Sequence, residues 1–566
     1  MALLRGRPTF DEPTLEADVD RALRFHRSEG FYAARVEANV ERNEARGLVD
    51  IELEIERGPP TQLRKLDVRW REPENAPIEL ALVLAAHELQ VGERFGARRY
   101  ESSRKALLAA LADAGHPLAS LEGGASVILE ESLADVHWVV TPGPAVQLGP
   151  ITVVGLETVD EVMVRRPLAI QTGQPFSPSA LRAAERAIYG NGLFRSVAAR
   201  PLRGAKSEPG SDERDEPAEV DASNRGTQPV IWPIEIRVDE RERRSIRVGG
   251  GWGTEDEFRV RGEWHHRNLF GQGENLEISG KYSSIVAGGE ARYRDPSFID
   301  PDIELEAPLG FERETEPGFD VNRTFVGFEL SRAVFEHWRF TGGYRFELAN
   351  PTDIDSDPFA DNESTVRLSS LLVRVRRLDL DDLFDPKFGS RIEIQMRPTL
   401  SALGSDIDTV ELTSKLRWYY TWRSITLALR ADSGTIEPVG STSSSEVPIF
   451  VRFFAGGSTS VRGYDRHALG PLDDDGDPLG GLSWSEGSAE LRFPIWNAIS
   501  GVFFFDVGQI RTKPHDWALN DYSAAWGGGI RIATPVGPLR FDLGIPLDDR
   551  PNAEAFEIYL SVGHTF

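Results

Sequence analysis

The segment from Phe453 to Tyr464 carries a single arginine, Arg462, in a glycine-flanked turn between apolar neighbours. A guanidinium group stays charged at neutral pH and binds carboxylates through a planar fork of donors. Downstream of this turn, each candidate strand is apolar on one side and polar on the other. An arginine held among such strands needs an enclosed polar interior. The pattern therefore indicates ion pairing inside a container.

No other group of residues forms a convincing catalytic or metal-binding arrangement in the sequence. The adjacent residues His265 and His266 lie in a candidate strand, where neighbouring side chains point to opposite faces and cannot easily share a metal. The segment Asp473–Asp477 is acidic, but it lacks the alternating ligands and the twelfth-position glutamate of a calcium loop. The absence of cysteine excludes thiolate ligands and a cysteine nucleophile. We expect a protein without enzyme activity, cofactor or metal.

The amino-acid composition limits both the partners that the protein can bind and the kind of membrane segment that it can contain. The 566 residues include 64 Lys and Arg against 90 Asp and Glu, a net charge of -26 that argues against a nucleic-acid partner. No apolar run is long enough for a transmembrane helix. The mean hydropathy of -0.33 is compatible with a membrane β-barrel, because barrel strands alternate and their average hydropathy stays low. Residues Met1–Pro8 contain no apolar core of signal-peptide length.

The first 243 residues contain a repeated module. Each copy begins with a Gly-containing turn, continues through an amphipathic helix, and reaches a glycine at the position where a helix end needs a left-handed residue. The three marker glycines are Gly30, Gly115 and Gly192. Two strand-like segments follow each glycine, and the later one alternates clearly. The alternating segments are 49–55, 136–140 and 234–238.

The repeat predicts three β-α-α-β-β modules, at residues 1–62, 63–146 and 147–243. The first copy lacks its opening strand and first helix. We attribute this to a late-assigned start or a trimmed chain, with a shortened module as the alternative. Residues 203–229 are rich in Glu, Asp, Ser, Pro and Gly, and this composition predicts a disordered insert in the third module.

The pattern of residues 244–566 predicts a transmembrane β-barrel. Segments of about 10 alternating residues recur between turns, with room for about 16 antiparallel strands. In the last segment, Phe556, Ile558, Leu560, Val562 and Phe566 share one side, opposite Glu557 and Tyr559. Glu490 and Asp506 also lie on the polar sides of their strands. A soluble β-sandwich would alternate too, but it would not usually need so many strands before an aromatic C-terminal residue.

Together these features resemble the BamA/TamA superfamily of outer-membrane assembly factors, which join periplasmic POTRA domains to a barrel. Gly456 and Gly457, followed by Val461, Arg462, Gly463 and Tyr464, match the family motif of the sixth extracellular loop. Four further segments match in order; they are 268–273, 487–494, 505–508 and 537–542. The three modules and the chain length are most similar to TamA-like members.

The resemblance implies that the sixth loop, about residues 456–487, folds into the barrel lumen. The matching arginine, Arg462, is then expected to contact acidic residues of the wall, with Glu490 and Asp506 as its partners. The side of the strand on which both carboxylates lie supports this independently. The family also implies the bacterial outer membrane as location, with the POTRA domains in the periplasm.

The function implied is a non-enzymatic insertase for client outer-membrane proteins. Its seam is expected between the first strand, about Ser245–Trp252, and the last, Phe556–Phe566. Gly249, Gly250 and Gly251 would weaken that seam, since glycine supplies no side-chain packing, or would only relieve crowding where the barrel closes. Opening of the seam could template client strands, while the POTRA sheets offer their edges to clients.

The implied partners are client proteins, the lipid bilayer, the barrel-assembly machinery that reads the strand ending in Phe566, and a TamB-like periplasm-spanning protein. The alternative function is a two-partner-secretion-type transporter pore or a passive channel.

Overall fold

The computed structural model describes the chain in two compact units, Met1–Arg241 and Glu242–Phe566. The residues described are 10–43, 45, 47–72, 88–202, 229–352, 365–383, 385–474, 476–518, 521–534, 539–548 and 554–562. The expected insert at 203–229 therefore lies outside the described residues except for its last position, and Phe566 lies outside them too. No helix among the described residues has both the length and the hydropathy needed to cross a membrane.

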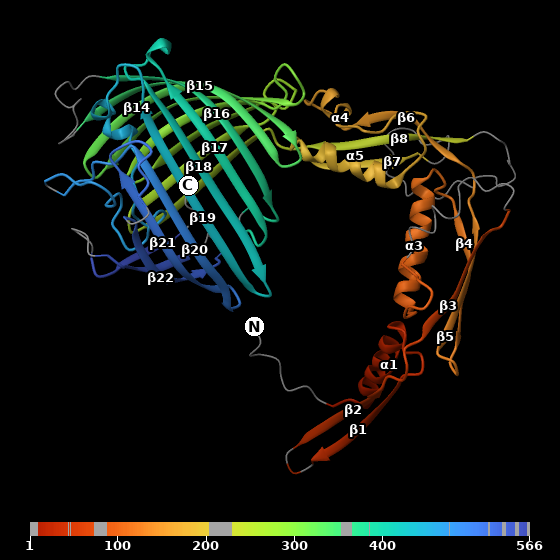
Figure 1. Cartoon of the computed structure of the whole chain (residues 1–566). Helices are drawn as coiled ribbons and strands as arrows, with labels where there is room; N and C mark the ends of the chain where they lie inside the picture. The colour runs from red at the N-terminus through yellow and green to blue at the C-terminus, as the bar shows by residue number, and fades with distance from the viewer. Residues whose placement is uncertain are drawn as a thin grey trace. The chain divides into compact units, whose positions relative to one another are not determined.

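The N-terminal unit contains three modules in series (Figure 1). The first has a two-stranded sheet and the others have three-stranded sheets in the orders β3-β5-β4 and β6-β8-β7. In both of these sheets the first and last strands of the module pair in parallel. The elements of the unit are α1 (Glu12–Ser28), β1 (Arg35–Asn43), β2 (Leu48–Glu56), β3 (Gln62–Trp70), α3 (Ala97–Asp113), β4 (Ser120–Ile128), β5 (Leu133–Thr141), β6 (Val146–Val154), α4 (Val162–Arg165), α5 (Pro178–Gly190), β7 (Phe194–Pro201) and β8 (Val230–Glu240).

The helix ends follow from local residue chemistry. Ser177 begins α5, where its side chain accepts a hydrogen bond from the Ala180 backbone N–H. The three marker glycines follow α1, α3 and α5 in the left-handed region, with φ of +98° for Gly30, +96° for Gly115 and +78° for Gly192. The left-handed helix ends expected from the sequence are confirmed.

The alternating strands of the modules differ in how deeply they are buried. Val136, Trp138 and Val140 of β5 are fully buried in the second module, and Ile234, Ile236 and Val238 of β8 are equally buried in the third. In the first module, Ile51, Leu53 and Ile55 of β2 are 45%, 41% and 42% exposed. Alternation in the sequence therefore predicted the strand in all three modules but the buried core in only two.

The C-terminal unit is a closed barrel of 16 antiparallel strands, β9 to β24, in which β24 returns to β9. Figure 1 shows the wall of this barrel, with β14 to β22 labelled. The predicted 16-stranded antiparallel barrel is confirmed. The strands are β9 (Arg244–Gly253), β10 (Glu257–His266), β11 (Asn275–Tyr282), β12 (Val286–Asp295), β13 (Ile303–Glu316), β14 (Phe319–Phe335), β15 (Trp338–Thr352), β16 (Val366–Leu380), β17 (Gly389–Thr399), β18 (Thr409–Trp422), β19 (Ile425–Pro438), β20 (Ser483–Trp496), β21 (Ile499–Arg511), β22 (Ser523–Ile532), β23 (Leu539–Pro546) and β24 (Glu557–Val562).

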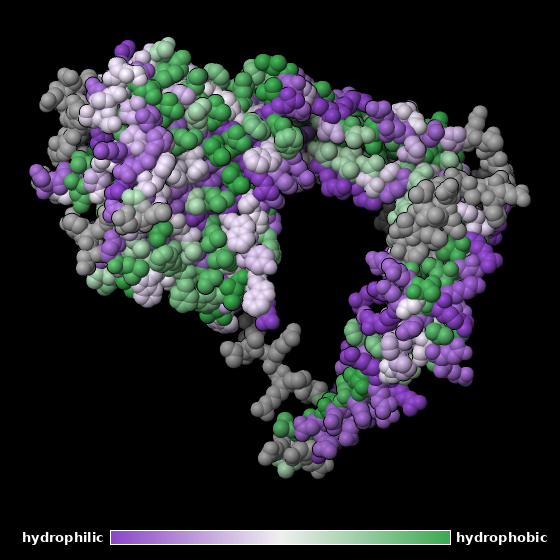
Figure 2. Space-filling model, viewed as in Figure 1, coloured by the Kyte–Doolittle hydropathy of each residue, from purple (hydrophilic) through white to green (hydrophobic). Residues whose placement is uncertain are grey.

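The alternation of the strands separates an apolar outer surface from a polar interior. On β21, Phe503 and Phe505 are 59% and 47% exposed, whereas Asp506 is completely buried. On β23, Phe541 is exposed while Asp542 is completely buried. Figure 2 shows hydrophobic side chains over much of the visible outer face of the barrel, whereas the N-terminal unit is largely hydrophilic. An apolar exterior of this kind suits a bilayer.

The barrel closes at Gly253–Ser561 and Trp252–Val562, which are the β9–β24 pairs among the described residues. A Cβ atom added at Gly251 would lie 2.5 Å from the Val562 carbonyl oxygen and 2.7 Å from Nε of Arg259. At Gly250 the nearest atom would be the Arg259 carbonyl oxygen, at an ordinary 3.6 Å. Relief of crowding therefore accounts for glycine at position 251 and not at position 250.

The end of β8 is held by the carboxylate of Glu240. This carboxylate accepts hydrogen bonds from the backbone N–H groups of Glu157 (2.8 Å), Thr158 (2.9 Å) and Val159 (2.9 Å), and from the Thr158 hydroxyl (2.6 Å). Partial burial alone would raise the pKa of Glu240, but these hydrogen bonds outweigh burial and hold that pKa below its usual range.

We expect Glu240→Ala to lower the local free energy of unfolding of the third module by roughly 1.5–3 kcal/mol, because the donors lose a charged acceptor. In the unsubstituted protein the depressed pKa makes this contribution complete at neutral pH. It should be lost as the pH falls below about 4.3, the ordinary glutamate value, and through the folded-state pKa. Hydrogen exchange of β6 and β8 in the full-length protein, corrected for the intrinsic effect of pH, measures both effects.

Asp239→Ala is the matched control, since Asp239 forms a surface ion pair with Arg195, in which the two side chains are 48% and 66% exposed. Equal losses in the two variants would contradict the role assigned to Glu240.

Candidate functional site

Residues 439–482 join β19 to β20, and the part that carries the motif is buried within the barrel. Val461, Arg462 and Tyr464 are 0%, 4% and 2% exposed, and Arg462 pairs with carboxylates of the strands β20 and β21. The segment ends earlier than expected, because residues 483–487 already belong to β20. We call residues 439–482 the lumen loop.

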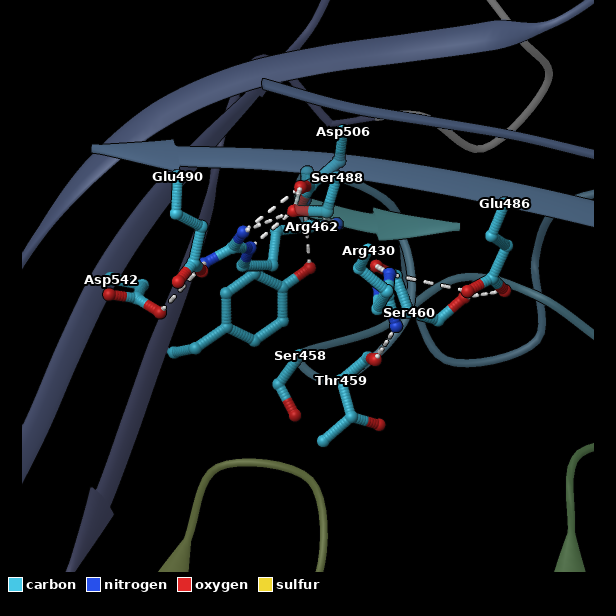
Figure 3. A network of polar contacts seen from close by, with 12 residues as sticks. Arg430, Ser458, Thr459, Ser460, Arg462, Glu486, Ser488, Glu490, Asp506 and Asp542 are labelled. Atoms are coloured by element: carbon cyan, nitrogen blue, oxygen red, sulfur yellow. Dashed lines mark hydrogen bonds and ion pairs between the residues drawn. The ribbon is translucent and has the colours of Figure 1, made fainter. Parts of the chain in front are cut away.

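The structure brings Arg462 to both carboxylates named from the sequence (Figure 3). The guanidinium Nε lies 2.7 Å from Oδ2 of Asp506 and donates to it, while Nη2 donates to Oδ1 at 2.9 Å. Nη1 forms an ion pair with Oε1 of Glu490 at 2.8 Å. The two-point contact with Asp506 fixes the plane of the guanidinium as well as its position.

A third carboxylate, Asp542 of β23, was not anticipated as a partner. Its Oδ2 lies 3.6 Å from Nη1 of Arg462 (Figure 3). Asp542 also pairs with Arg531 and accepts from Nε of Arg540 at 2.6 Å. The signal was present in the sequence, since Asp542 lies on the polar side of its strand within one of the family segments. The cluster joins β20, β21 and β23 through one loop residue.

The surroundings of Arg462 remove it from water. The guanidinium carbon lies 3.5 Å from the centroid of the Phe504 ring, a close cation–π contact. Ser488 donates from its hydroxyl to Asp506 at 2.5 Å and accepts from Nη2 of Arg462 at 3.3 Å. Charges buried in this way are costly unless each has a partner, so loss of either member leaves an uncompensated charge.

The backbone conformation of the lumen loop explains why its motif contains glycine at two positions. Gly457 and Gly463 have φ of +99° and +100°, in the left-handed region that side chains disfavour. A Cβ atom at Gly457 would also lie 2.6 Å from Oε1 of Glu255. Both positions therefore require glycine if the loop is to follow its path along the wall.

The lumen loop binds both sides of the barrel seam. On the last strand, the hydroxyl of Tyr559 accepts from the Gly463 N–H at 3.0 Å and donates to the Tyr464 carbonyl at 2.9 Å. In the β9–β10 turn, Glu255 accepts from the Ser458 N–H at 2.7 Å and bonds the Ser458 hydroxyl. Sequence reasoning placed Tyr559 on the polar side of its strand without giving it a role, and it missed Glu255 entirely.

Two more anchors hold the loop at separate strands. Nη1 of Arg430, on β19, donates to the Thr459 carbonyl at 2.6 Å, and the same guanidinium pairs with Glu486 at 3.3 Å (Figure 3). Nε of the loop residue Arg466 donates to Glu316 of β13 at 2.7 Å. The loop is therefore attached around the wall and not at one point.

Among the described residues, Glu263, His265 and Glu277 form a cluster whose ligand atoms could share a cation. The cluster already has internal partners, since Nε of Arg261 donates to Glu263 at 2.6 Å and Nε2 of His265 lies 3.0 Å from that carboxylate. We assign it as an ion-pair cluster of the wall.

Comparison with known proteins identifies the family. The model of the Omp85 superfamily domain matches residues 268–566. The chain belongs to the Omp85 superfamily. This membership confirms the superfamily assignment made from the loop motif and the barrel segments.

Relatives match over almost the whole chain. The outer membrane protein assembly factor BamA of Nitratidesulfovibrio vulgaris is 24% identical over 97% of this chain and 67% of its own length. The protein of the same name from Neisseria meningitidis is 21% identical over 98% of this chain and 73% of its own length. The prediction of a TamA-like member stays a prediction.

A solved structure shares the fold of this Omp85 protein. The crystal structure of BamA from Haemophilus ducreyi lacking POTRA domains 1–3 matches with a TM-score of 0.72 and 17% sequence identity. It covers 89% of this chain and 100% of its own, so the shared fold extends beyond the barrel into the N-terminal modules.

We expect Arg462→Ala to lower the free energy of unfolding of the barrel by about 3–5 kcal/mol, because Asp506 becomes a buried charge without its cationic partner, while Glu490 is left with Arg492. Arg492→Ala is the matched control, since its side chain is 37% exposed and it pairs with Glu490 alone among carboxylates of the described residues; its loss should cost about 1 kcal/mol or less. Denaturant unfolding followed by the gel mobility of the folded barrel measures the difference. Equal shifts in the two variants would rule out a special role for Arg462.

Proposed function

We propose that this Omp85 protein is a non-enzymatic outer-membrane assembly factor that inserts client barrel proteins through its β9–β24 seam. The observation that carries the proposal is the construction of the closure. The lumen face of β9 has glycine at positions 249 and 251, and the lumen loop bonds to both sides of the seam. The names of the BamA relatives support the same activity.

The physical argument starts from the cost of unpaired backbone. In lipid, an exposed N–H or C=O group has no water to bind, so a barrel cannot open sideways unless another strand takes its place. A client strand can fill that place by adding to the free edge of β9. At positions 249 and 251 β9 itself contributes no side chain to the packing that must be broken.

The lumen loop keeps the rest of the barrel intact during such an opening. Its ion pairs join β20, β21 and β23 through Arg462, and all three strands lie on the β24 side of the seam without neighbouring β9 in the barrel order. The wall can therefore separate at the seam while the buried charges stay paired. In this proposal Arg462 acts as an internal brace.

The location and partners follow from the same proposal. The barrel lies in the bacterial outer membrane and the N-terminal modules are POTRA domains in the periplasm. The outer strands of their sheets, β3 and β4 in the second module and β6 and β7 in the third, offer edges to client strands. The barrel-assembly machinery that inserts this chain and a TamB-like partner belong to the proposal as well.

We expect a disulfide across the seam to block client insertion. Trp252 and Val562 are directly paired on β9 and β24, and the chain contains no native cysteine, so Trp252→Cys with Val562→Cys gives one defined bridge. Insertion of a client barrel into liposomes containing the oxidised protein should fall at least tenfold. It should return after reduction.

The control bridge joins Leu491→Cys to Phe503→Cys, a pair on the adjacent strands β20 and β21 that also faces outward. This bridge should leave insertion unchanged. Full insertion by the oxidised seam variant would reject lateral insertion. A large steady conductance that is the same with the seam disulfide oxidised and reduced would favour the passive-channel or secretion-pore alternative.

A further inference from the structure

Arg259 of β10 reaches across the first barrel strand to the last one. Its side chain faces the lumen and is 4% exposed. It is paired in register with Gly251 of β9, so its side chain lies over a position that has none. From there Nη2 donates to the Val562 carbonyl of β24 at 3.2 Å.

The glycine at position 251 makes this reach possible. Any larger residue would place its Cβ atom 2.7 Å from Nε of Arg259 and 2.5 Å from the Val562 carbonyl oxygen. Both the arginine and the carbonyl group would have to move. The bond between β10 and β24 therefore depends on a gap in the side chains of the strand between them.

A second group aims the guanidinium. Asp256, in the β9–β10 turn, accepts from Nη1 of Arg259 at 2.7 Å. Beside it, a Cβ atom at Gly253 would lie 2.5 Å from Oδ1 of Asp256, so this position is also left open for the ion pair. The same turn donates to β24 through its backbone, since the Thr254 N–H bonds the Leu560 carbonyl at 3.0 Å.

We propose that Arg259 is a seam latch: a positioning residue that holds β24 against the β9–β10 hairpin until a client strand arrives. The link to insertion rests on the function proposed above, whereas the latch is a property of the seam itself. The acceptor is a neutral main-chain carbonyl, so release of β24 leaves no unpaired acid. The guanidinium keeps its partner Asp256 when the seam opens.

The latch differs from the brace in the strands that it joins. Arg462 binds carboxylates of β20, β21 and β23, whereas Arg259 connects the two sides of the seam directly. Removal of the brace should weaken the whole barrel. Removal of the latch should raise the population of open seam with little effect on strands far from it.

The test is hydrogen exchange of the full-length barrel in liposomes, without any client. Arg259→Met keeps most of the side-chain volume over Gly251 but removes every donor. The seam amides of β24 should exchange roughly tenfold faster than in the unsubstituted protein, because one hydrogen bond to a charged group is lost. Amides shared by β20 and β21 should exchange at their original rates.

Arg292→Met is the matched control, because Arg292 lies on β12, which is not a seam strand, and its Nε donates to Glu290 of its own strand. It should leave the β24 amides unchanged. Asp256→Ala supplies a second variant that deletes no buried cation. It should accelerate hydrogen exchange of the same β24 amides by a smaller factor. If Arg259→Met does not fold, the exchange rates of Asp256→Ala test the latch in its place.

Unchanged β24 exchange in Arg259→Met would overturn the latch, and so would an equal acceleration throughout the barrel. Failure of the proposed function looks different. If the oxidised seam bridge still inserts clients but Arg259→Met loosens β24, lateral insertion fails and the latch stands. If the bridge blocks insertion but β24 exchange is unchanged, the latch alone fails.

Discussion

The structure depends on the burial of one cation, Arg462, against the carboxylate of Asp506. The interaction is 2.7 Å long, and both side chains are almost completely removed from solvent. Such a pair is stable only where further partners offset the loss of water, and Glu490, Asp542 and Ser488 supply them. A polar, enclosed lumen is therefore a requirement of the loop, and the alternation of apolar and polar residues along the strands is the sequence-level consequence.

The sequence predicted those parts of the site that depend on local patterns. A period of two residues identifies a strand and sorts its side chains between lipid and lumen, so the inward positions of Glu490 and Asp506 could be read directly. The left-handed helix ends at Gly30, Gly115 and Gly192 could also be predicted, because they depend only on neighbouring residues. Arg462 was singled out as the one arginine of a glycine-flanked turn among alternating strands, and the family motif then implied its place in the lumen loop.

The other contacts of the site depend on which inward-facing residues come close in space, and alternation along a strand does not determine this. Which inward residues meet in a closed barrel is set by the stagger between strands, and that stagger accumulates around the whole wall. Asp542, Tyr559 and Glu255 were accordingly missed, although two of them lie on strands whose polar side was known. Alternation also could not tell that Ile51, Leu53 and Ile55 would stay exposed, because burial depends on what packs against a strand.

The chemistry of the bonds explains how one barrel can be both braced and separable. The lumen loop is tied to β20, β21 and β23 by ion pairs, whose rupture would leave buried charges unpaired. Its bonds to β24, in contrast, join the Tyr559 hydroxyl to main-chain groups of Gly463 and Tyr464, and the bond from Arg259 also ends on a neutral carbonyl. Breaking these bonds to β24 leaves no acid unpaired, and the Arg259 guanidinium keeps Asp256 as its partner, so it costs less than separating the buried ion pairs. The contacts that hold β24 to the lumen loop and to Arg259 are hydrogen bonds that involve main-chain groups. Another strand can replace them with equivalent contacts, since every strand carries the same main-chain acceptors.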